Sequence, residues 1–206
     1  MLGLMGDPPS VPRNGKQGRS MPGFHVVVSG ASGSGKTTLA PLLAAELGLP
    51  LISKDTIKEA LADVLGLGDI EWSRRLGAAA FEALFALAAE APAAVLETRW
   101  YPEPCSTRLA ALGKPLVEVF CRCPVEVVRG RLATRVATRH PIHHDAIDPS
   151  LVEGVAADAE HARPLGLGPV LIVNTDGPTE ITEIANRVRA EVDVLIQAAT
   201  HSQAGV

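Results

Sequence analysis

The sequence has few aromatic residues and no long apolar segment. Aromatic residues make up 3% of its 206 residues, so the hydrophobic core must be built mainly from alanine, leucine and valine. The longest mostly apolar stretch, residues 76–94, is interrupted by Glu82, Glu90 and Pro92. A bilayer span needs about 18 to 20 consecutive apolar residues. We therefore expect no membrane partner, and we predict that this stretch is a buried helix.

Cysteine and basic charge are also scarce. The three cysteines, Cys105, Cys121 and Cys123, provide no disulfide framework, which is typical of a reducing, cytoplasmic compartment. The formal net charge is −4 at pH 7, whereas a dedicated nucleic-acid-binding domain usually carries a basic excess. This balance argues against nucleic acid as a partner but leaves room for a local basic site.

The first 20 residues differ in composition from the rest of the chain. They contain four glycines and three prolines, and their apolar residues show no helical or strand period. They also lack the apolar segment of a secretory signal. We predict a disordered tail over residues 1–20 and a single folded domain over residues 21–206, with Met21 as a candidate natural start.

A glycine-rich motif at residues 30–37 stands between a predicted strand and a predicted helix. Three valines at residues 26–28 indicate a short buried strand, the sequence G-x-x-x-x-G-K-T follows, and residues 39–47 indicate a helix. This is the context of a P-loop, in which backbone N–H groups at a helix N-terminus bind phosphate. The alternative is a Gly/Ser-rich turn that merely links the strand and the helix. The order of the three elements favours a nucleoside triphosphate site.

The residue types of the motif have separate roles. The glycines allow a turn tight enough for N–H groups to wrap an anion. Lys36 can reach the β- and γ-phosphates, and the Thr37 hydroxyl can ligate Mg²⁺. The predicted nucleotide-binding residues are Gly30, Ser32, Gly33, Ser34, Gly35, Lys36, Thr37 and Thr38. Residues 174–177 lack the lysine and the spacing of a guanine-reading motif, so we expect ATP rather than GTP.

Strand and helix patterns alternate along the chain. We predict strands at 26–28, 51–53, 93–97, 115–121 and 170–173. The predicted helices are 39–47, 54–65, 71–91, 106–112, 125–135, 149–162 and 178–198. This alternation predicts an α/β fold with a doubly wound, five-stranded parallel sheet. Ligands of such sheets bind at the carboxyl ends of the strands.

Acidic and basic residues follow two of these strand ends. Asp55 comes directly after the second predicted strand, where a carboxylate can accept the proton of an attacking hydroxyl. Equally, an Asp in a first helical turn can simply complement the helix dipole. Glu97 and Arg99 follow the third strand, and they could serve Mg²⁺ and an acceptor or merely pair with neighbouring charges.

A local excess of arginine follows the fourth predicted strand. Residues 122–139 contain five arginines and one glutamate, a local net charge of +4 in an acidic chain. Arg131, Arg135 and Arg139 recur every four residues, so one continuous helix would place them on one face. Arginine neutralises a transferring phosphoryl group well because it donates bidentately. The alternative is a solvated basic helix face.

Cysteine and histidine near this region invite a zinc hypothesis. Cys121 and Cys123 occupy alternate strand positions, so their thiols should point to opposite faces of the sheet. They could not share one ion, and we expect no metal site there. The histidine-rich stretch 140–144 is predicted to be a loop that contacts substrate, responds to pH or does neither.

The P-loop followed by a strand and S-K-D-T-I-K at residues 53–58 resembles the P-loop kinases of the adenylate-kinase-like fold, a nucleoside-kinase-like P-loop NTPase architecture. The most similar are predicted small-molecule kinases grouped with polynucleotide kinase and zeta-toxin-type kinases, some classed as AAA-type ATPases. The resemblance implies that Asp55 is the general base. It also implies that Lys58, where the family more often has Arg, contacts the acceptor.

The resemblance also implies a helical lid, over about residues 122–149, whose Arg131 and Arg135 act in catalysis beside Lys36. By the same analogy Thr37 holds Mg²⁺, Glu97 is linked to the metal, and Arg99 is a candidate acceptor contact. The expected function is ATP-dependent phosphotransfer to a hydroxyl of a small molecule. An ATP-operated switch with a protein partner, and a toxin-like or nucleic-acid-end kinase, remain alternatives.

Overall fold

A computed structural model describes residues 23–135, 138–144, 154 and 158–204, and the predicted tail over residues 1–20 lies outside them. Five strands form one sheet in the order β2-β3-β1-β4-β5, and every neighbouring pair is parallel. Their bounds are β1 Phe24–Ser29, β2 Leu51–Ser53, β3 Ala93–Glu97, β4 Leu116–Arg122 and β5 Val170–Asn174. The predicted doubly wound parallel sheet is confirmed.

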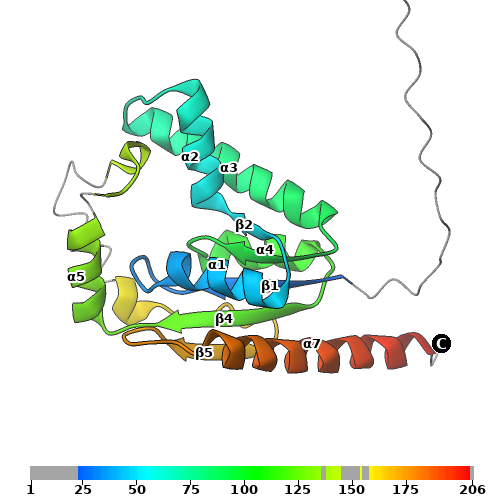
Figure 1. Ribbon diagram of the computed structural model, residues 1–206. Coiled ribbons are helices and arrows are strands. Elements are labelled where there is room, and N and C mark those ends of the chain that lie inside the picture. Colours follow the sequence, from blue (N-terminus) through cyan, green and yellow to red (C-terminus); the bar gives the residue numbers. More distant parts are fainter. Residues whose placement is uncertain (1–22, 136–137, 145–153, 155–157, 205–206) are drawn as a thin grey trace, which may run out of the picture.

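Helices connect the strands as the alternating pattern requires. They are α1 Lys36–Leu47, α2 Lys54–Leu65, α3 Ile70–Glu90, α4 Pro102–Ala111, α5 Val125–Arg135 and α7 Ile181–Ala204, with a 3-10 turn η1 at Pro141–His143 (Figure 1). The helix predicted over 149–162 falls largely outside the described residues, although 158–161 are helical. None of the helices that the structure describes is long and apolar enough to cross a membrane.

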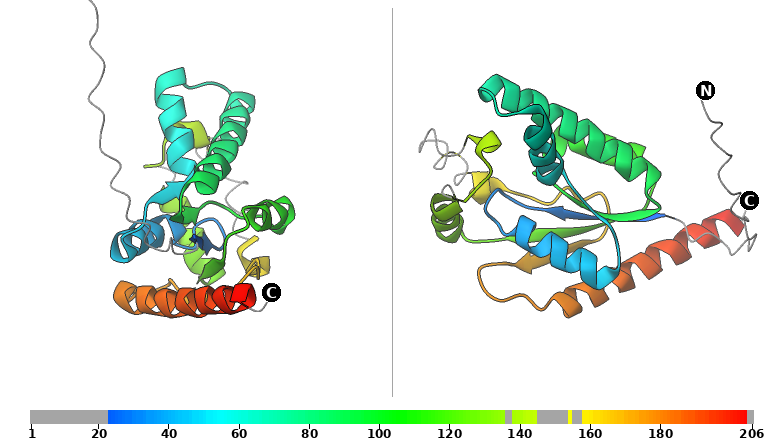
Figure 2. Two further views of the ribbon diagram at one scale, coloured as in Figure 1. Left: turned by 90° about the vertical axis from the view of Figure 1, so that its right-hand side faces the viewer. Right: turned by 45° about the horizontal axis from the view of Figure 1, so that its top comes forward.

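The two faces of the sheet bury separate hydrophobic cores. Side chains of successive strand residues point to opposite faces, so Val26 and Val28 face one core and Val27 faces the other. The first core packs α1 and α7 against the sheet, and the second packs α3 and α4. Figure 2 (left) shows α1 and α4 on opposite sides of the strands. This arrangement leaves the carboxyl ends of the strands free to form a site.

Helices α2 and α3 project beyond the sheet as a pair (Figure 1). Asp69 caps α3 by accepting a hydrogen bond from the Trp72 N–H at 2.8 Å, which starts the helix one residue before the predicted position. The turn η1 packs against the pair through Ile142, which is buried with Ala62 and Leu76. A segment far from α2 in sequence therefore completes this part of the fold, since Ile142 lies 84 residues after Lys58 of α2.

The boundaries of α4 and α5 affect the site. Helix α4 spans Pro102–Ala111 instead of beginning at residue 106, but its start is kinked, because Glu103 has non-helical angles (φ −115°, ψ 134°). Helix α5 ends at Arg135, so Arg139 does not continue the same helical face as Arg131 and Arg135. Helix α5 thus ends where the sequence predicts, the three arginines do not share one continuous helix, and Arg139 contacts α2.

Candidate active site

The P-loop wraps an anion-sized cradle between β1 and α1. Gly30, Gly33 and Gly35 have φ values of +131°, +79° and +91°, a region that disfavours residues with a Cβ. A Cβ on Gly30 would lie 2.5 Å from the carbonyl oxygen of Cys121. The cradle therefore requires these glycines, and its position at the N-terminus of α1 suits the phosphates of ATP.

Lys36 lies inside this cradle with 6% of its surface exposed. Its Nζ donates a hydrogen bond to the carbonyl oxygen of Ala31 at 2.6 Å. Burial lowers the pKa of Lys36 to about 8, although the nearby carboxylate of Glu97 opposes that shift. A buried lysine held at the centre of an anion cradle is suited to neutralise phosphate charge.

The carboxylate of Glu97, at the end of β3, contacts Thr37 in the first turn of α1. Glu97 Oε1 accepts a hydrogen bond from Thr37 Oγ1 at 3.3 Å, and Glu97 Oε2 accepts one from Ser53 Oγ at 2.7 Å. Only 4% of Glu97 is exposed. Mg²⁺ prefers hydroxyl, carboxylate and water oxygens, so Thr37 with Glu97 nearby fits a magnesium site at the edge of the cradle.

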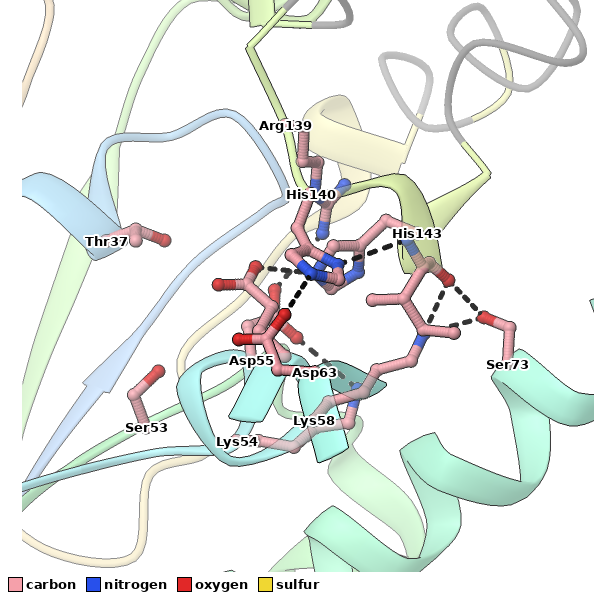
Figure 3. Close-up of polar contacts among 12 residues, drawn as sticks. Thr37, Ser53, Lys54, Asp55, Lys58, Asp63, Ser73, Arg139, His140 and His143 are labelled. Carbon is pink, nitrogen blue, oxygen red and sulfur yellow. Dashed lines mark hydrogen bonds and ion pairs between the residues drawn. The ribbon is translucent and has the colours of Figure 1, made fainter. Parts of the chain in front are cut away.

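Asp55 is the second residue of α2, which follows β2 directly, as the sequence predicts. Its Oδ1 lies 3.5 Å from Lys54 Nζ, and its Oδ2 lies 3.1 Å from Arg139 Nη2 (Figure 3). Burial alone would raise the pKa of Asp55, but the positive charges of Lys54, His143 and Arg139 outweigh burial and lower it below its ordinary value. The carboxylate is therefore ionised at neutral pH and can accept a proton.

Arg131 of α5 joins the P-loop to the segment after β5. Its Nη2 donates to the carbonyl oxygen of Thr175 at 2.5 Å, and its Nη1 lies 3.4 Å from where a Cβ on Gly35 would be. Thr175 Oγ1 in turn donates to the carbonyl oxygen of Ser34 at 2.6 Å. These contacts place Arg131 beside the phosphate cradle, and Arg135 lines the same cavity one turn later.

A single cavity of about 980 Å³ contains these groups. Its nucleotide half is lined by Ser32, Gly33, Gly35, Lys36, Thr37, Thr38, Arg131, Arg135, Thr175, Gly177 and Thr179. The other half is lined by Lys54, Asp55, Lys58, Ser73, Arg74, Gly77, Ala78, Phe81, Arg99, Tyr101, Arg139 and His143, among others. Asp55 therefore faces the same space as the P-loop. Gly30 and Ser34 support the loop from outside this lining.

The two predicted acceptor contacts, Lys58 and Arg99, both line the second half of the cavity. Lys58 Nζ donates to Ser73 Oγ at 2.8 Å and to the carbonyl oxygen of Ile142 at 3.3 Å. Arg99 pairs with Asp158 and stacks over the ring of Tyr101, 4.8 Å from its centroid. Neither of these two contacts of Arg99 involves Glu97, and its expected role as an acceptor contact stays a prediction.

Sequence reasoning did not extend the site along α3 beyond residue 75, yet this helix forms one side of the cavity. Ser73, Gly77 and Phe81 repeat every four residues and lie on one face of the helix, toward the cavity. A polar, a small and an aromatic residue at this spacing interrupt an alanine-rich helix. That interruption is the signal that could have identified the wall of a site.

The cysteines do not form a metal site. Cys121 is buried in the core with α1 and α7, whereas Cys123 packs against Val128 and Leu132 of α5. Burial raises the pKa of Cys121 to about 12, so its thiol stays protonated. Within the described part of the chain, no group of three or more His, Cys, Asp or Glu residues could hold a metal ion.

The sheet order, the P-loop and the cavity at the strand ends define a P-loop protein with the adenylate-kinase-like kinase fold. The chain belongs to the AAA domain family, whose sequence profile matches residues 26–151. No curated protein sequence matches it.

Solved structures with the same fold agree with this assignment. A "putative kinase" from Chloroflexus aurantiacus J-10-fl is 34% identical, with a TM-score of 0.74 over 83% of this chain and 98% of that chain. A gluconokinase from Sinorhizobium meliloti 1021 is 18% identical, with a TM-score of 0.55 over 89% and 99% of the two chains. A shikimate kinase from Bacteroides thetaiotaomicron is also 18% identical, with a TM-score of 0.50 over 87% and 98%. The last two show the fold alone. The predicted resemblance to P-loop kinases is confirmed.

Proposed function

We propose that this protein is an ATP-dependent kinase that transfers the γ-phosphoryl group of Mg·ATP to a hydroxyl group of a small molecule. The observation that carries the proposal is the continuous cavity, in which the P-loop forms one half and Asp55 faces the other. A nucleotide-operated switch needs only the nucleotide half. A second compartment that opens onto the phosphate cradle is what phosphoryl transfer to another molecule requires.

The proposal gives each residue a role in an in-line displacement. Asp55 accepts the proton of the acceptor hydroxyl while the hydroxyl oxygen bonds to the γ-phosphorus. The bond between the γ-phosphorus and the oxygen that bridges it to the β-phosphate breaks, and ADP leaves. Lys36, Arg131 and Arg135 neutralise the charge on the transferred group. Thr37 would hold Mg²⁺ with Glu97 close by, and the metal, when bound, neutralises charge on the β- and γ-oxygens.

The acceptor half of the cavity supports a small-molecule acceptor. Lys58, Arg74 and Arg99 provide cations there, and Phe81 and Tyr101 provide aromatic surface. We propose Lys58 and Arg99 as acceptor contacts, and we take residues 122–149 as the lid of a single domain over residues 21–206. Two fold neighbours are named for gluconate and shikimate, so polyols and hydroxy acids are the first acceptors to test.

The test is an assay of ADP release with purified protein, Mg·ATP and a panel of hydroxylated metabolites, sugars, nucleosides and antibiotics. Acceptor-dependent release, together with a phosphorylated product seen by mass spectrometry, is the expected result. Turnover that instead requires a protein partner would favour the ATP-operated switch. Salt-sensitive binding and phosphorylation of oligonucleotides would favour a nucleic-acid-end kinase.

A further inference from the structure

Gly77 lies in the middle of α3 and lines the cavity. Glycine inside a helix is less stable than alanine, and Gly77 has no positive φ that would demand it. Among the described residues, the atoms nearest to a Cβ built on Gly77 are Lys54 Nζ and Lys58 Cε, both at 3.9 Å. That distance is an ordinary van der Waals separation, so the fold itself would accept alanine. The missing side chain therefore keeps space open in the acceptor half of the cavity.

Two lysines of α2 border this space. Lys54 and Lys58 are four residues apart, so they lie on the same face of the helix. Lys58 has 7% of its surface exposed, and its Nζ donates to Ser73 Oγ at 2.8 Å and to the Ile142 carbonyl oxygen at 3.3 Å (Figure 3). An oxygen that bonds to Lys54 Nζ lies about 2.9 Å from it, so a Cβ at 3.9 Å would crowd that oxygen. The space beside Gly77 is therefore suited to an oxygen atom of a ligand.

Cations outnumber carboxylates among the described residues that line this half of the cavity. Lys54 and Arg139 share one carboxylate, that of Asp55, at 3.5 and 3.1 Å. The two oxygens to which Lys58 Nζ donates are uncharged. A carboxylate or phosphate group complements such ammonium and guanidinium groups through charge-assisted hydrogen bonds. A second negative charge, brought by the acceptor, would therefore be stabilised beside Asp55.

The other charged or titratable side chains that line this half have carboxylate partners of their own. The pairs are Arg74–Glu71 at 3.9 Å, Arg99–Asp158 and His143–Glu59 at 2.8 Å. These three carboxylates are not part of the cavity lining. The corner formed by Lys54 and Lys58 is therefore the place where an anionic acceptor meets cations next to the proposed base.

We propose that Lys54, Lys58 and Gly77 form a subsite for an anionic group of the acceptor, which is therefore a hydroxy acid or a hydroxy phosphate and not a neutral polyol. The two lysines donate to the anionic oxygens. Gly77 is a specificity-determining residue, because it leaves room for these oxygens. The inference rests on the proposed function for the hydroxyl that lies at Asp55, whereas binding of the anion needs no transfer.

Calorimetric titration of the full chain with matched probes tests the subsite without turnover. Mg²⁺ and a non-hydrolysable ATP analogue fill the P-loop, so that the probes cannot bind there. The probes are gluconate and glycerate, glucose 6-phosphate and glycerol 3-phosphate, and the neutral counterparts glucose and glycerol. At least one anion should bind about tenfold or more tightly than its neutral counterpart, and the two anionic series distinguish a carboxylate from a phosphate. Equal binding of anions and neutral probes, or no binding of any anion, would overturn the proposal.

Gly77→Ala separates the subsite from a structural role. Alanine in the helix should raise the melting temperature by about 1–4 °C, yet weaken binding of the tightest anionic probe about tenfold or more. Gly130→Ala is the matched control: it lies within α5, away from the cavity lining, and should raise the melting temperature without changing the binding. A lower melting temperature in Gly77→Ala would mean that the fold needs this glycine, and unchanged binding would mean that the anion lies elsewhere. Either result would overturn the role of Gly77.

Lys54→Gln tests the charge by itself. It should weaken binding of the same anion about tenfold and leave the neutral counterpart within about twofold, because only the anion interacts with the ammonium group. Arg187→Gln, an exposed control on α7, should bind like the wild type. Equal losses for the anion and its neutral counterpart would overturn the subsite.

The subsite and the proposed function fail in different ways. Anion binding that depends on Lys54 and Gly77, with no transfer to any probe from Mg·ATP, would contradict the proposed function and leave the subsite standing. Transfer to a neutral polyol with the same KM as to its acid would overturn the subsite and leave the kinase standing.

Discussion

Thr37 Oγ1 lies 3.3 Å from Glu97 Oε1, and this contact joins the first turn of α1 to the end of β3. The other carboxylate oxygen of Glu97 accepts a hydrogen bond from Ser53 Oγ, and Ser53 immediately precedes α2. Thr37, which is expected to hold Mg²⁺, and Ser53, at the end of β2, therefore bond to the same buried carboxylate. A change at Glu97 should affect metal use first.

We predict that Glu97→Gln raises the Mg²⁺ concentration needed for half-maximal ADP release by about tenfold or more. The amide keeps the shape of the side chain but removes its charge, whereas ATP binding in EDTA should be unchanged. A titration of Mg²⁺ at fixed ATP measures the effect. Glu126→Gln, an exposed control on α5, should not change the requirement, and an unchanged requirement in Glu97→Gln would contradict the metal assignment.

Substitution of the proposed base should separate transfer from binding. Asp55→Asn should lower the rate of transfer about 10²- to 10⁴-fold, because an amide cannot accept the acceptor proton. The dissociation constant for ATP should change less than about threefold, since Asp55 lies outside the phosphate cradle. Single-turnover transfer and equilibrium nucleotide binding measure the two effects. Asp69→Asn is the matched control, because Asn caps α3 as well as Asp does. Full activity of Asp55→Asn would rule out the base.

Nucleotide binding should take up protons at mildly alkaline pH. The pKa of Lys36 is about 8 without nucleotide, and phosphate charge beside the ammonium would raise that pKa. At about pH 8 roughly half of the Lys36 side chains are uncharged, so binding should take up to about half a proton per site. Calorimetry in buffers of different ionisation enthalpy measures this uptake. It should vanish in Lys36→Met, and its absence in the wild type would refute the assignment.

Two glycines should respond in opposite directions to the same substitution. In Gly35→Ala, alanine would have to adopt a φ of +91°, and its Cβ would lie 3.3 Å from Thr175 Cβ. We therefore expect the unfolding free energy to fall by about 1–2 kcal/mol and ATP binding to weaken. Gly130 lies within α5 with no atom within 4 Å of a built Cβ. Gly130→Ala should raise the unfolding free energy by about 0.5–1 kcal/mol. Urea unfolding of both variants checks the contrast, and equal effects would contradict it.

The parts of the site that could be predicted are those whose position depends only on the neighbouring sequence. The P-loop residues and Asp55 each directly follow a buried strand, and parallel strands end at one edge of the sheet. Their shared cavity thus follows from the alternation of strands and helices. The glycines could be assigned because their backbone conformation is a local requirement.

The rest depends on which distant segments meet. Ile142 contacts Lys58 and Ser73 across 84 and 69 residues, and nothing in the neighbouring sequence marks these partners. The four-residue spacing from Arg135 would put Arg139 on the same face of a continuous helix, but α5 ends at Arg135 and Arg139 bonds to Asp55. The histidine-rich stretch was expected in a loop, but its two carboxylate partners on α2, Glu59 and Asp63, could be found only from the structure.

The two halves of the cavity are held together by different contacts. Thr175 connects the P-loop with Arg131 on the nucleotide side, while α2, α3 and residues 139–143 support one another on the acceptor side. Substitutions on the face of α3 that carries Ser73 and Phe81 can therefore remodel the acceptor compartment while the phosphate cradle keeps its geometry. Descendants of one such ancestral gene could acquire new acceptors step by step and still use the same phosphoryl donor.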